Sequence, residues 1–374
     1  MLKSFFRATR MFIFQRRAPA FLAGLLFLAA SPLWAQMADF QPTLTVGAGI
    51  QTSYDHAQPD GGKAVDTFGL DHLRLYFSGD ITKYLSAMVN TDYIANTNGI
   101  NGNSLQVLDA VGQFHMSPMI NIWFGRFLPP SDRANLYGPF YANEYKVYTD
   151  GIQDGYPFIF QGRDNGAMYW GDFKAGSVKI KASAGAFDGA SATASNDVIF
   201  ATRVQLDFWD PENGYYLNGT YYGDKNLLAI GGATEVQDNK TAATFDFLLE
   251  RKIMNGGAFT IESEYARYDG VGGYPCNCKK SQGGYGLASV LFPKQIGMGK
   301  IQATGKFAEA EFTGIGPLTR QKTTEVNLNY IIKQFDARIM AYGKNTTFTG
   351  GQKEFWDAGV GLQFQLSKQI LGPK

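Results

Sequence analysis

Apolar and polar residues alternate along much of the chain. In WDAGVGLQFQL, residues 356–366, every second residue from Trp356 to Leu366 is apolar, and Asp, Gly or Gln lies between. Successive side chains of a strand point to opposite faces, so this segment predicts a strand with one apolar face and one polar face. The same period of two recurs in LTVGAGI (44–50), HLRLYFSG (72–79), VKIKASAGAF (178–187) and FDARIMAYGK (335–344).

The connections between the predicted strands are either short or long. The short ones are GDITKY (79–84), HMSPM (115–119), KIMNGG (252–257), GMGK (297–300) and KQFD (333–336). The segments 128–164 and 270–284 are long. In bacterial transmembrane barrels, short turns lie at one end, long loops lie at the other, and the number of strands is even. The lengths of the connections and the even strand number agree if 210–226 is a single connection at the short-turn end. This gives sixteen strands.

Sixteen amphipathic strands predict a closed barrel. A soluble all-β domain of this size would need a second core for its polar faces, yet these faces carry Lys, Arg, Asp and Glu. In a transmembrane barrel the apolar face contacts lipid, the polar face contacts water, and closure leaves no unpaired backbone edge in lipid. A barrel of about sixteen strands also leaves an aqueous channel. The expected fold class is therefore all-β, a transmembrane antiparallel β-barrel of about sixteen strands.

Residues 1–35 have the features of a secretory signal peptide. Five basic residues precede the apolar run FLAGLLFLAA (21–30), and the segment ends in the small residue Ala35. This order is typical of a signal peptide, and no later run of roughly 18 apolar residues predicts a helical membrane span. We expect cleavage near Ala35 and a single barrel domain over 36–374.

Charge and cysteine content restrict the partners. Beyond residue 35 the chain keeps 29 of its 34 Lys and Arg against 33 Asp and Glu, a net charge of −4. A negative net charge argues against nucleic acid as a partner. The only cysteines are Cys276 and Cys278. A lone C-x-C supplies too few ligands for a metal site, so we expect a loop feature, no metal and no cofactor.

Several stretches resemble the phosphate-selective (O/P-type) porins of Gram-negative outer membranes. They are HLRLYFSGDI (72–81), INIWFGRFLPPSDRANL (120–136), GRDNGAMYWGDF (162–173), KASAGAFDGA (181–190) and ATRVQLDFWDPENGYY (201–216). Their order and spacing carry the likeness over most of the chain after residue 68. The resemblance implies an outer-membrane channel of sixteen strands, usually a homotrimer, with a loop folded into the lumen. The dense ladder of Arg and Lys found in anion-selective members is not evident here.

The alternation assigns charges of both signs to the lumen. The predicted pore-lining residues are Arg74, Lys179, Lys181, Arg203, Lys306, Arg338, Lys344, Asp207, Glu262 and Glu264. Further acidic candidates are Asp92, Asp246, Glu250, Asp336 and Asp357. Rings of one sign select ions, whereas a mixed lining predicts weak selectivity among small polar solutes or inorganic ions, anions such as phosphate included. Alternatively, each charge only forms a local salt bridge on a solvated wall.

The segment 128–164 is the predicted constriction because it is too long for an ordinary connection. Its candidate residues are Asp132, Arg133, Tyr141, Glu144, Tyr145, Lys146, Tyr148 and Asp150. Other aromatic residues in it are Tyr137, Phe140, Tyr156, Phe158 and Phe160. Folded inward, the aromatic rings would pack on the wall and the charges would set the field at the narrowest point. Folded outward, the segment would be a surface loop. We expect this segment, the long third loop of the barrel, to fold inward.

Two positions test the strand phase. Strict alternation in NIWFGRF places Arg126 on the apolar face with Ile122 and Phe124. Charge on that face is costly at the middle of the bilayer and much less so near its surface, so Arg126 lies at the rim or a bulge near Gly125 turns it inward. The alternation also places Phe335 on the outer face.

The predicted function is that of an outer-membrane porin that lets small polar solutes or ions diffuse passively across the outer membrane of a Gram-negative bacterium. One alternative is a barrel sheath around a multihaem cytochrome, which would be a separate chain because no C-x-x-C-H is present. A second is an outer-membrane enzyme. The chain has three histidines, His56, His72 and His115, and no G-x-S-x-G motif, so we expect no enzymatic activity.

Overall fold

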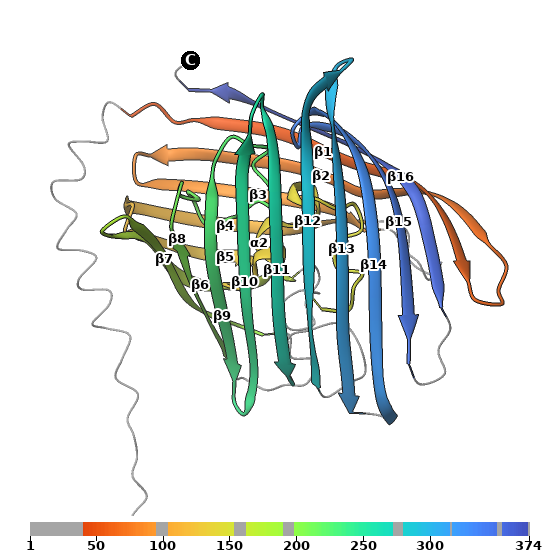
Figure 1. The fold of residues 1–374 in the computed structure, drawn as a ribbon. Coiled ribbons are helices and arrows are strands. Elements are labelled where there is room, and N and C mark those ends of the chain that lie inside the picture. The colour runs from red at the N-terminus through yellow and green to blue at the C-terminus, as the bar shows by residue number, and fades with distance from the viewer. Residues whose placement is uncertain are drawn as a thin grey trace, which may run out of the picture. The chain divides into compact units, whose positions relative to one another are not determined.

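The computed structural model describes residues 40–94, 104–152, 162–189, 198–271, 280–314, 316–349 and 354–372. The compact unit Pro42–Lys374 contains sixteen antiparallel strands that form a closed barrel (Figure 1). Each strand pairs with its neighbours in sequence, and β1 pairs with β16 to close the barrel. The predicted fold class and strand number are therefore confirmed.

The first eight strands are β1 (Leu44–Pro59), β2 (Val65–Thr82), β3 (Leu85–Ile94), β4 (Ser104–Ser117), β5 (Ile120–Phe127), β6 (Asp164–Ala175), β7 (Val178–Phe187) and β8 (Ile199–Asp207). The last eight are β9 (Leu227–Gln237), β10 (Lys240–Ile253), β11 (Gly257–Asp269), β12 (Lys280–Ile296), β13 (Gly299–Gly314), β14 (Gly316–Lys333), β15 (Ala337–Phe348) and β16 (Phe355–Leu371). A short helix α2 (Arg133–Tyr137) and a 3₁₀ turn η2 (Pro139–Tyr141) follow β5.

The two faces of the wall follow the sequence alternation. On β16, Asp357, Gly361 and Gln363 are buried inside the barrel, whereas Trp356 and Leu362 are exposed on its outside. Other large apolar side chains on the outer surface include Phe124, Phe200, Phe245, Phe307, Val326 and Leu328. A contiguous apolar surface of this kind is rare on soluble monomers and is expected where a barrel contacts hydrocarbon.

The connection 208–226 explains the strand number. It joins β8 to β9 without a strand of its own, as the sequence predicts. It lies at the turn end of the barrel, which we define as the end where β2 joins β3 and β14 joins β15. The end where β5 joins β6 is the loop end.

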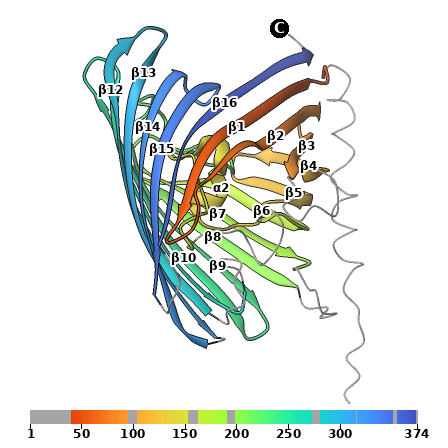
Figure 2. The ribbon, with the colours of Figure 1, turned by 90° about the vertical axis from the view of Figure 1, so that its right-hand side faces the viewer.

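Two segments fill part of the lumen. We call residues 128–152 the inward loop and residues 208–226 the inward connection. Helix α2 of the inward loop lies inside the ring of strands in both ribbon views (Figures 1 and 2). The inward folding of the third loop was predicted, but the inward connection was expected to be an ordinary connection. Among the described residues, no helix has the length and hydropathy needed to cross a membrane.

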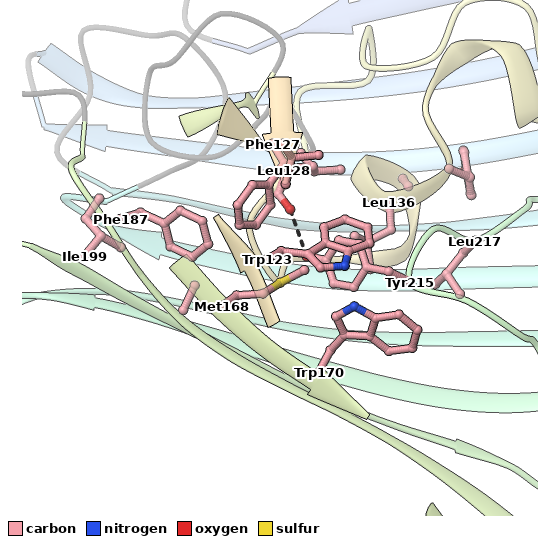
Figure 3. Packing of buried hydrophobic residues seen from close by; sticks show 14 of the residues in the cluster. Trp123, Phe127, Leu128, Leu136, Met168, Trp170, Phe187, Ile199, Tyr215 and Leu217 are labelled. Atoms are coloured by element: carbon pink, nitrogen blue, oxygen red, sulfur yellow. Dashed lines mark hydrogen bonds between the residues drawn. The ribbon is translucent and has the colours of Figure 1, made fainter. Parts of the chain in front are cut away.

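An aromatic cluster joins both segments to the wall (Figure 3). Trp123 on β5 and Trp170 on β6 meet edge to face, with ring centroids 6.1 Å apart, and Tyr215 of the inward connection lies 5.0 Å from Trp123. The Tyr215 hydroxyl donates a hydrogen bond to the carbonyl oxygen of Leu128, at 2.8 Å. Edge-to-face aromatic pairs stabilise beyond the area that they bury, so this cluster fixes where the two segments enter the lumen.

The structure decides three points about the phase and the ends of the strands. Arg126 stays on the outer face near the end of β5, because the β4–β5 register runs without a shift from Ala110 to His115. Phe335 is not on the outer face; it lies in the turn before β15 and is buried. The apolar alternation of the last strand stops at Leu366, but β16 continues to Leu371 because it pairs with β1.

Some predictions fall outside the described residues. They are the signal peptide over 1–35, Cys276 and Cys278, and the aromatic residues Tyr156, Phe158 and Phe160.

Candidate functional site

The inward loop and the inward connection meet inside the barrel through their backbones. The amide of Leu217 donates to the carbonyl of Leu136 at 3.3 Å, and the amide of Gly219 donates to the carbonyl of Tyr141 at 2.9 Å. The Asn143 side chain donates back to the carbonyl of Gly219 at 2.7 Å. Buried backbone groups need partners of this kind. Each segment thus supplies hydrogen-bond partners to the other, and the two together form one constriction.

A buried ion pair joins the same two segments. Arg133 of the inward loop donates to both carboxylate oxygens of Glu212, at 3.0 and 2.5 Å. Both side chains are fully buried. Burial alone would raise the pKa of Glu212, but the Arg133 guanidinium outweighs it and lowers this pKa to about 2. A bidentate pair fixes geometry as well as charge, so Arg133 and Glu212 hold the constriction together.

Asp132 begins helix α2. Its side chain accepts hydrogen bonds from the backbone amide of Asn135 at 2.8 Å and from the Asn135 side chain at 2.6 Å. Burial of the carboxylate raises the pKa of Asp132 to about 6. This is the arrangement of a helix N-cap, so Asp132 positions the adjacent Arg133.

The acidic residues of the inward loop bind a wall lysine. The Lys306 ammonium on β13 lies 2.9 Å from Glu144 and 2.8 Å from Asp150, and all three side chains are buried. Lys306 also lies over the ring of Tyr285, 4.2 Å from its centroid. A single wall ammonium thus binds two loop carboxylates, so it offsets only one of their two negative charges.

Tyr145 and Lys146 attach the inward loop to a second part of the wall. The ring of Tyr145 stacks on Tyr342 of β15 with centroids 5.3 Å apart, and its hydroxyl donates to Asp71 at 2.7 Å. Lys146 pairs with Asp55 at 2.9 Å. The loop therefore contacts β1, β2 and β15 as well as β13.

Tyr141 and Tyr148 have different positions in the inward loop. Tyr141 is partly exposed and packs edge to face on Phe335, with centroids 5.1 Å apart. Tyr148 has a φ of 67° and donates from its hydroxyl to the carbonyl of Ala134 at 2.8 Å. Tyr141 thus faces open space, whereas Tyr148 supports the loop from within.

Arg338 binds the inward loop from β15. Its guanidinium donates to the carbonyls of Ala142 at 2.6 Å and Phe140 at 3.2 Å, and to the side chain of Gln363 at 2.7 Å. Arg338 is fully buried. The sequence assigned it to the pore lining, and the structure places it beneath the loop.

Most other predicted lumen cations lie beside a carboxylate. The pairs are Arg74 with Asp92 at 3.0 Å, Arg203 with Asp246 at 2.5 Å, Lys179 with Asp172 at 3.0 Å and Lys344 with Asp357 at 3.5 Å. Lys181 donates to the carbonyl of Gly214, and Asp207 accepts from the amide of Glu212 at 2.9 Å. The structure thus places these predicted side chains on the inner wall, in contact with each other or with the inward connection.

Several wall carboxylates have no ion-pair partner among the described residues. Glu262 accepts hydrogen bonds from Tyr137 at 2.9 Å and Tyr285 at 2.7 Å. Glu264, Glu235 and Glu325 are also buried on the inner wall. Where ionised, these groups give the lumen a negative field, because the cations near them are already paired.

Glu212, Glu235 and Glu325 were not among the residues predicted to lie in the lumen. Glu235 and Glu325 lie on strands at polar positions of the alternation and could have been assigned from it. Glu212 could not, because a connection has no period. The unusual length and tyrosine content of 210–226 were the available signal, since 128–164 has the same two properties.

A cavity of about 460 Å³ lies between the constriction and the turn end. Its wall is formed by Thr45, Arg74, Tyr76, Ser78, Met88, Asn90, Asp109, Arg163, Asp336, Gln365, Leu366 and Ser367. The inward loop contributes Asn135, Leu136, Tyr137 and Tyr141, and the inward connection contributes Tyr216, Leu217 and Asn218. We call this cavity the vestibule. It is a water-accessible space within the barrel, as a channel requires.

One histidine lies in a chain of polar contacts. His115 Nε2 is 2.9 Å from the hydroxyl of Ser86, and His115 Nδ1 is 2.8 Å from Asn121 Oδ1. The Asn121 amide nitrogen donates to the carbonyls of Pro118 and Trp170, so Oδ1 faces the imidazole. Because Oδ1 only accepts, Nδ1 carries the proton, and Nε2 of the neutral ring faces the serine. His56 and His72 instead contact Asp66 and Asp92.

Neither a protein-family model nor a curated protein matches the chain. Among solved structures, the anion-selective porin from Comamonas acidovorans matches with a TM-score of 0.54 and 10% identity, covering 87% of this chain and 100% of that one. OmpT of Vibrio cholerae matches with 0.52 and 10%, covering 88% and 99%. Acinetobacter baumannii OccAB4 matches with 0.50 and 11%, covering 88% and 100%. At these identities the likeness establishes a common fold with outer-membrane porins.

Proposed function

We propose that the chain forms an outer-membrane channel for the passive diffusion of small polar solutes, with weak selectivity among ions. The observation that supports the proposal best is the closed barrel with apolar side chains outside and charged side chains inside. Only lipid outside and water inside suit both faces of such a wall. Transport of this kind needs no cofactor and no catalytic step.

The charges inside the barrel support weak selectivity with a small preference for cations. Arg74, Arg203 and Lys306 are each compensated by a carboxylate, so they add no net positive field. Glu235 and Glu264 lack such partners among the described residues. Since acidic linings favour cations, we propose a relative of the O/P-type porins that lacks their preference for anions and phosphate.

Planar lipid bilayers provide the test. Protein comprising residues 36–374 is reconstituted, and single-channel currents are recorded in a salt gradient. Stepwise ohmic conductance with a small reversal potential on the cation-selective side is expected. Folded protein without conductance would contradict the channel, and a strong anion-selective potential would contradict the assignment of the lumen charges.

The variant Glu264→Gln tests which groups set the preference. It keeps the shape of the side chain and removes the ionisable carboxyl group, so recordings at a pH where Glu264 is ionised should show the reversal potential moving toward zero. Gln282→Glu is a matched control, because Gln282 is exposed on the same strand pair but outside the lumen. Gln282→Glu adds one negative charge instead of removing one, so a shift of equal size and opposite sign in this control would show that surface charge, not the lumen, sets the selectivity.

A second candidate function, ester hydrolysis, rests on Ser86, His115 and Asn121. The proton placement derived above is the one that a general base beside a serine nucleophile requires. Two observations favour the channel over this function: Gln113 also accepts from Ser86 at 3.0 Å, and Ser86 does not line the vestibule. A fluorophosphonate probe decides between them. Labelling of the parent protein that is lost in Ser86→Ala and in His115→Gln would establish a hydrolase. Absence of labelling in the folded parent protein would exclude ester hydrolysis at Ser86.

The inward loop and the inward connection occupy the lumen with the chain's own residues. A sheath around a cytochrome would have to displace both, including the buried Arg133–Glu212 pair, so a channel suits the structure better than a sheath. Assembly as a homotrimer in the outer membrane is part of the proposal and rests on the resemblance. Cross-linking in native membranes followed by denaturing electrophoresis tests it, and a monomeric band alone would contradict it.

A further inference from the structure

We propose that the vestibule is a binding site for neutral polyhydroxylated solutes such as mono- and disaccharides. This inference rests on the channel function proposed above and names the class of solute. The cavity of about 460 Å³ falls within the range of roughly 300 to 1,000 Å³ that is usual for small-molecule sites.

The charged groups of the vestibule are already compensated. Arg74 pairs with Asp92 at 3.0 Å, and Arg163 pairs with Asp109 at 3.5 Å. Asp336, at the turn end, pairs with Lys333 at 2.9 Å. A phosphate or a carboxylate would need a cation without such a partner, and a metal ion would need unpaired carboxylates. The vestibule therefore suits an uncharged ligand.

The neutral polar groups of the vestibule can both donate and accept hydrogen bonds. Its wall supplies the hydroxyls of Thr45, Ser78 and Ser367, together with the amides of Asn90 and Gln365. Hydroxyl and amide groups do both, whereas ammonium and carboxylate groups do only one. Since each hydroxyl of a sugar also does both, such a lining matches a polyhydroxylated solute.

Two further polar groups line the vestibule, one from each segment of the constriction. Tyr141 belongs to the inward loop and Asn218 to the inward connection, and both are partly exposed in the vestibule. Among the described residues, neither the Tyr141 hydroxyl nor the Asn218 side-chain amide has a hydrogen-bond partner. They are thus available to a solute that stops at the narrowest point.

Aromatic rings give the same space apolar surfaces. Tyr76, Tyr137, Tyr141 and Tyr216 all line the vestibule. A tyrosine ring has an apolar body and a polar tip, and a pyranose ring has apolar C–H faces between its hydroxyls. A lining of tyrosine rings and amide groups therefore suits a sugar better than an inorganic ion.

The position of the vestibule predicts that sugar binds more readily from one side of the membrane. Apart from Arg163, which directly precedes β6 at the loop end, its wall residues lie near the turn end or in the middle of their strands. A sugar added at the turn end should reach the site without passing the constriction. The site should therefore respond more strongly to sugar on one side of a bilayer than on the other.

The experiment measures single-channel current with maltose, glucose or inorganic phosphate added to one side at a time. We expect maltose at millimolar concentration to reduce the current in a saturable way, more from the turn end than from the loop end, and phosphate to have no saturable effect. Conductance without any saturable sugar effect would overturn the inference and leave the channel intact. A saturable block by phosphate alone would overturn it in favour of an anion site.

Two variants locate the site. Asn218→Ala and Tyr141→Phe each remove one unpartnered polar group and should weaken maltose block several-fold, measured relative to the sugar-free conductance of the same variant. Asn213→Ala is the matched control, because Asn213 lies on the same inward connection, is exposed and does not line the vestibule. Equal block in Asn218→Ala, Tyr141→Phe and the parent protein would overturn the assignment.

Discussion

At the scale of single residues, most cations of the lumen are paired with carboxylates. Arg133 illustrates this best, because its side chain is fully buried and only a carboxylate partner can offset the loss of hydration of its guanidinium group. Removal of one member of a buried ion pair costs more than replacement of both by apolar residues. The pair thus makes folding of the inward loop depend on folding of the inward connection.

We expect Arg133→Ala to destabilise the barrel by about 3–5 kcal/mol, because it leaves Glu212 buried without its cation. Urea unfolding of the protein in lipid vesicles, followed by tryptophan fluorescence, measures the loss. The double variant Arg133→Met with Glu212→Leu should recover most of it. A double variant as unstable as the single one would contradict the role of the pair.

The same pair makes stability depend on pH. The pKa of Glu212 is lowered from an ordinary 4.5 to about 2 by Arg133, against the effect of burial. A lowered pKa stabilises the fold fully above pH 4.5, and this contribution is lost as the pH falls from 4.5 toward 2. Urea midpoints at pH 7, 4.5 and 3 should fall more steeply for the parent protein than for Glu212→Gln. Parallel curves would contradict this assignment.

At the scale of elements, wall glycines make room for the inward loop. Gly361 on β16 is one of the two glycines of WDAGVGLQFQL, and a Cβ there would lie 2.1 Å from the ring of Tyr145. The sequence predicted that this position faces inward but not why it is glycine. The reason is a contact with a residue more than two hundred positions earlier, which no local pattern contains.

Gly361→Ala should move Tyr145 away from the wall and raise the single-channel conductance. The stack on Tyr342 and the hydrogen bond to Asp71 would be lost, so the inward loop would have fewer contacts to hold it. Gly343→Ala on β15 is the control, since a Cβ there would meet only the Val326 side chain, at 3.8 Å. A conductance equal to that of the control would show that Tyr145 does not narrow the pore.

At the scale of the whole molecule, closure of the barrel depends on the end of β16. Residues Ser367 to Leu371 pair with Leu44 to Gly47 of β1. Closure is what removes the last unpaired strand edge. The segment after Leu366 therefore has a structural role, although its sequence lacks the apolar alternation of the preceding strand.

Deletion of residues 367–374 should reduce the fraction of protein that folds into lipid vesicles. The deletion removes the pairing that closes the barrel at the turn end. Heat-modifiable migration in electrophoresis measures the folded fraction. Deletion of 373–374 alone, beyond β16, is the control and should fold like the parent protein. Equal folding of both deletions would contradict the importance of this pairing.

The sequence by itself determined the barrel. Alternation with a period of two, an even strand number and the lengths of the connections are local properties, so sixteen strands, their faces and a long third loop could all be predicted. The inward placement of Arg74, Lys306 and Glu262 followed from the same period.

Only the tertiary structure decided what lies inside. That Arg133 meets Glu212, that Tyr145 needs Gly361, and that Phe335 turns inward all depend on segments far apart in the sequence. The chain outside regular strands has no period, and the lumen imposes no repeating pattern on the side chains that enter it. The contacts there are set by shape and charge in three dimensions, which is why the wall and the inward loop could be predicted but the inward connection and the contacts within the constriction could not.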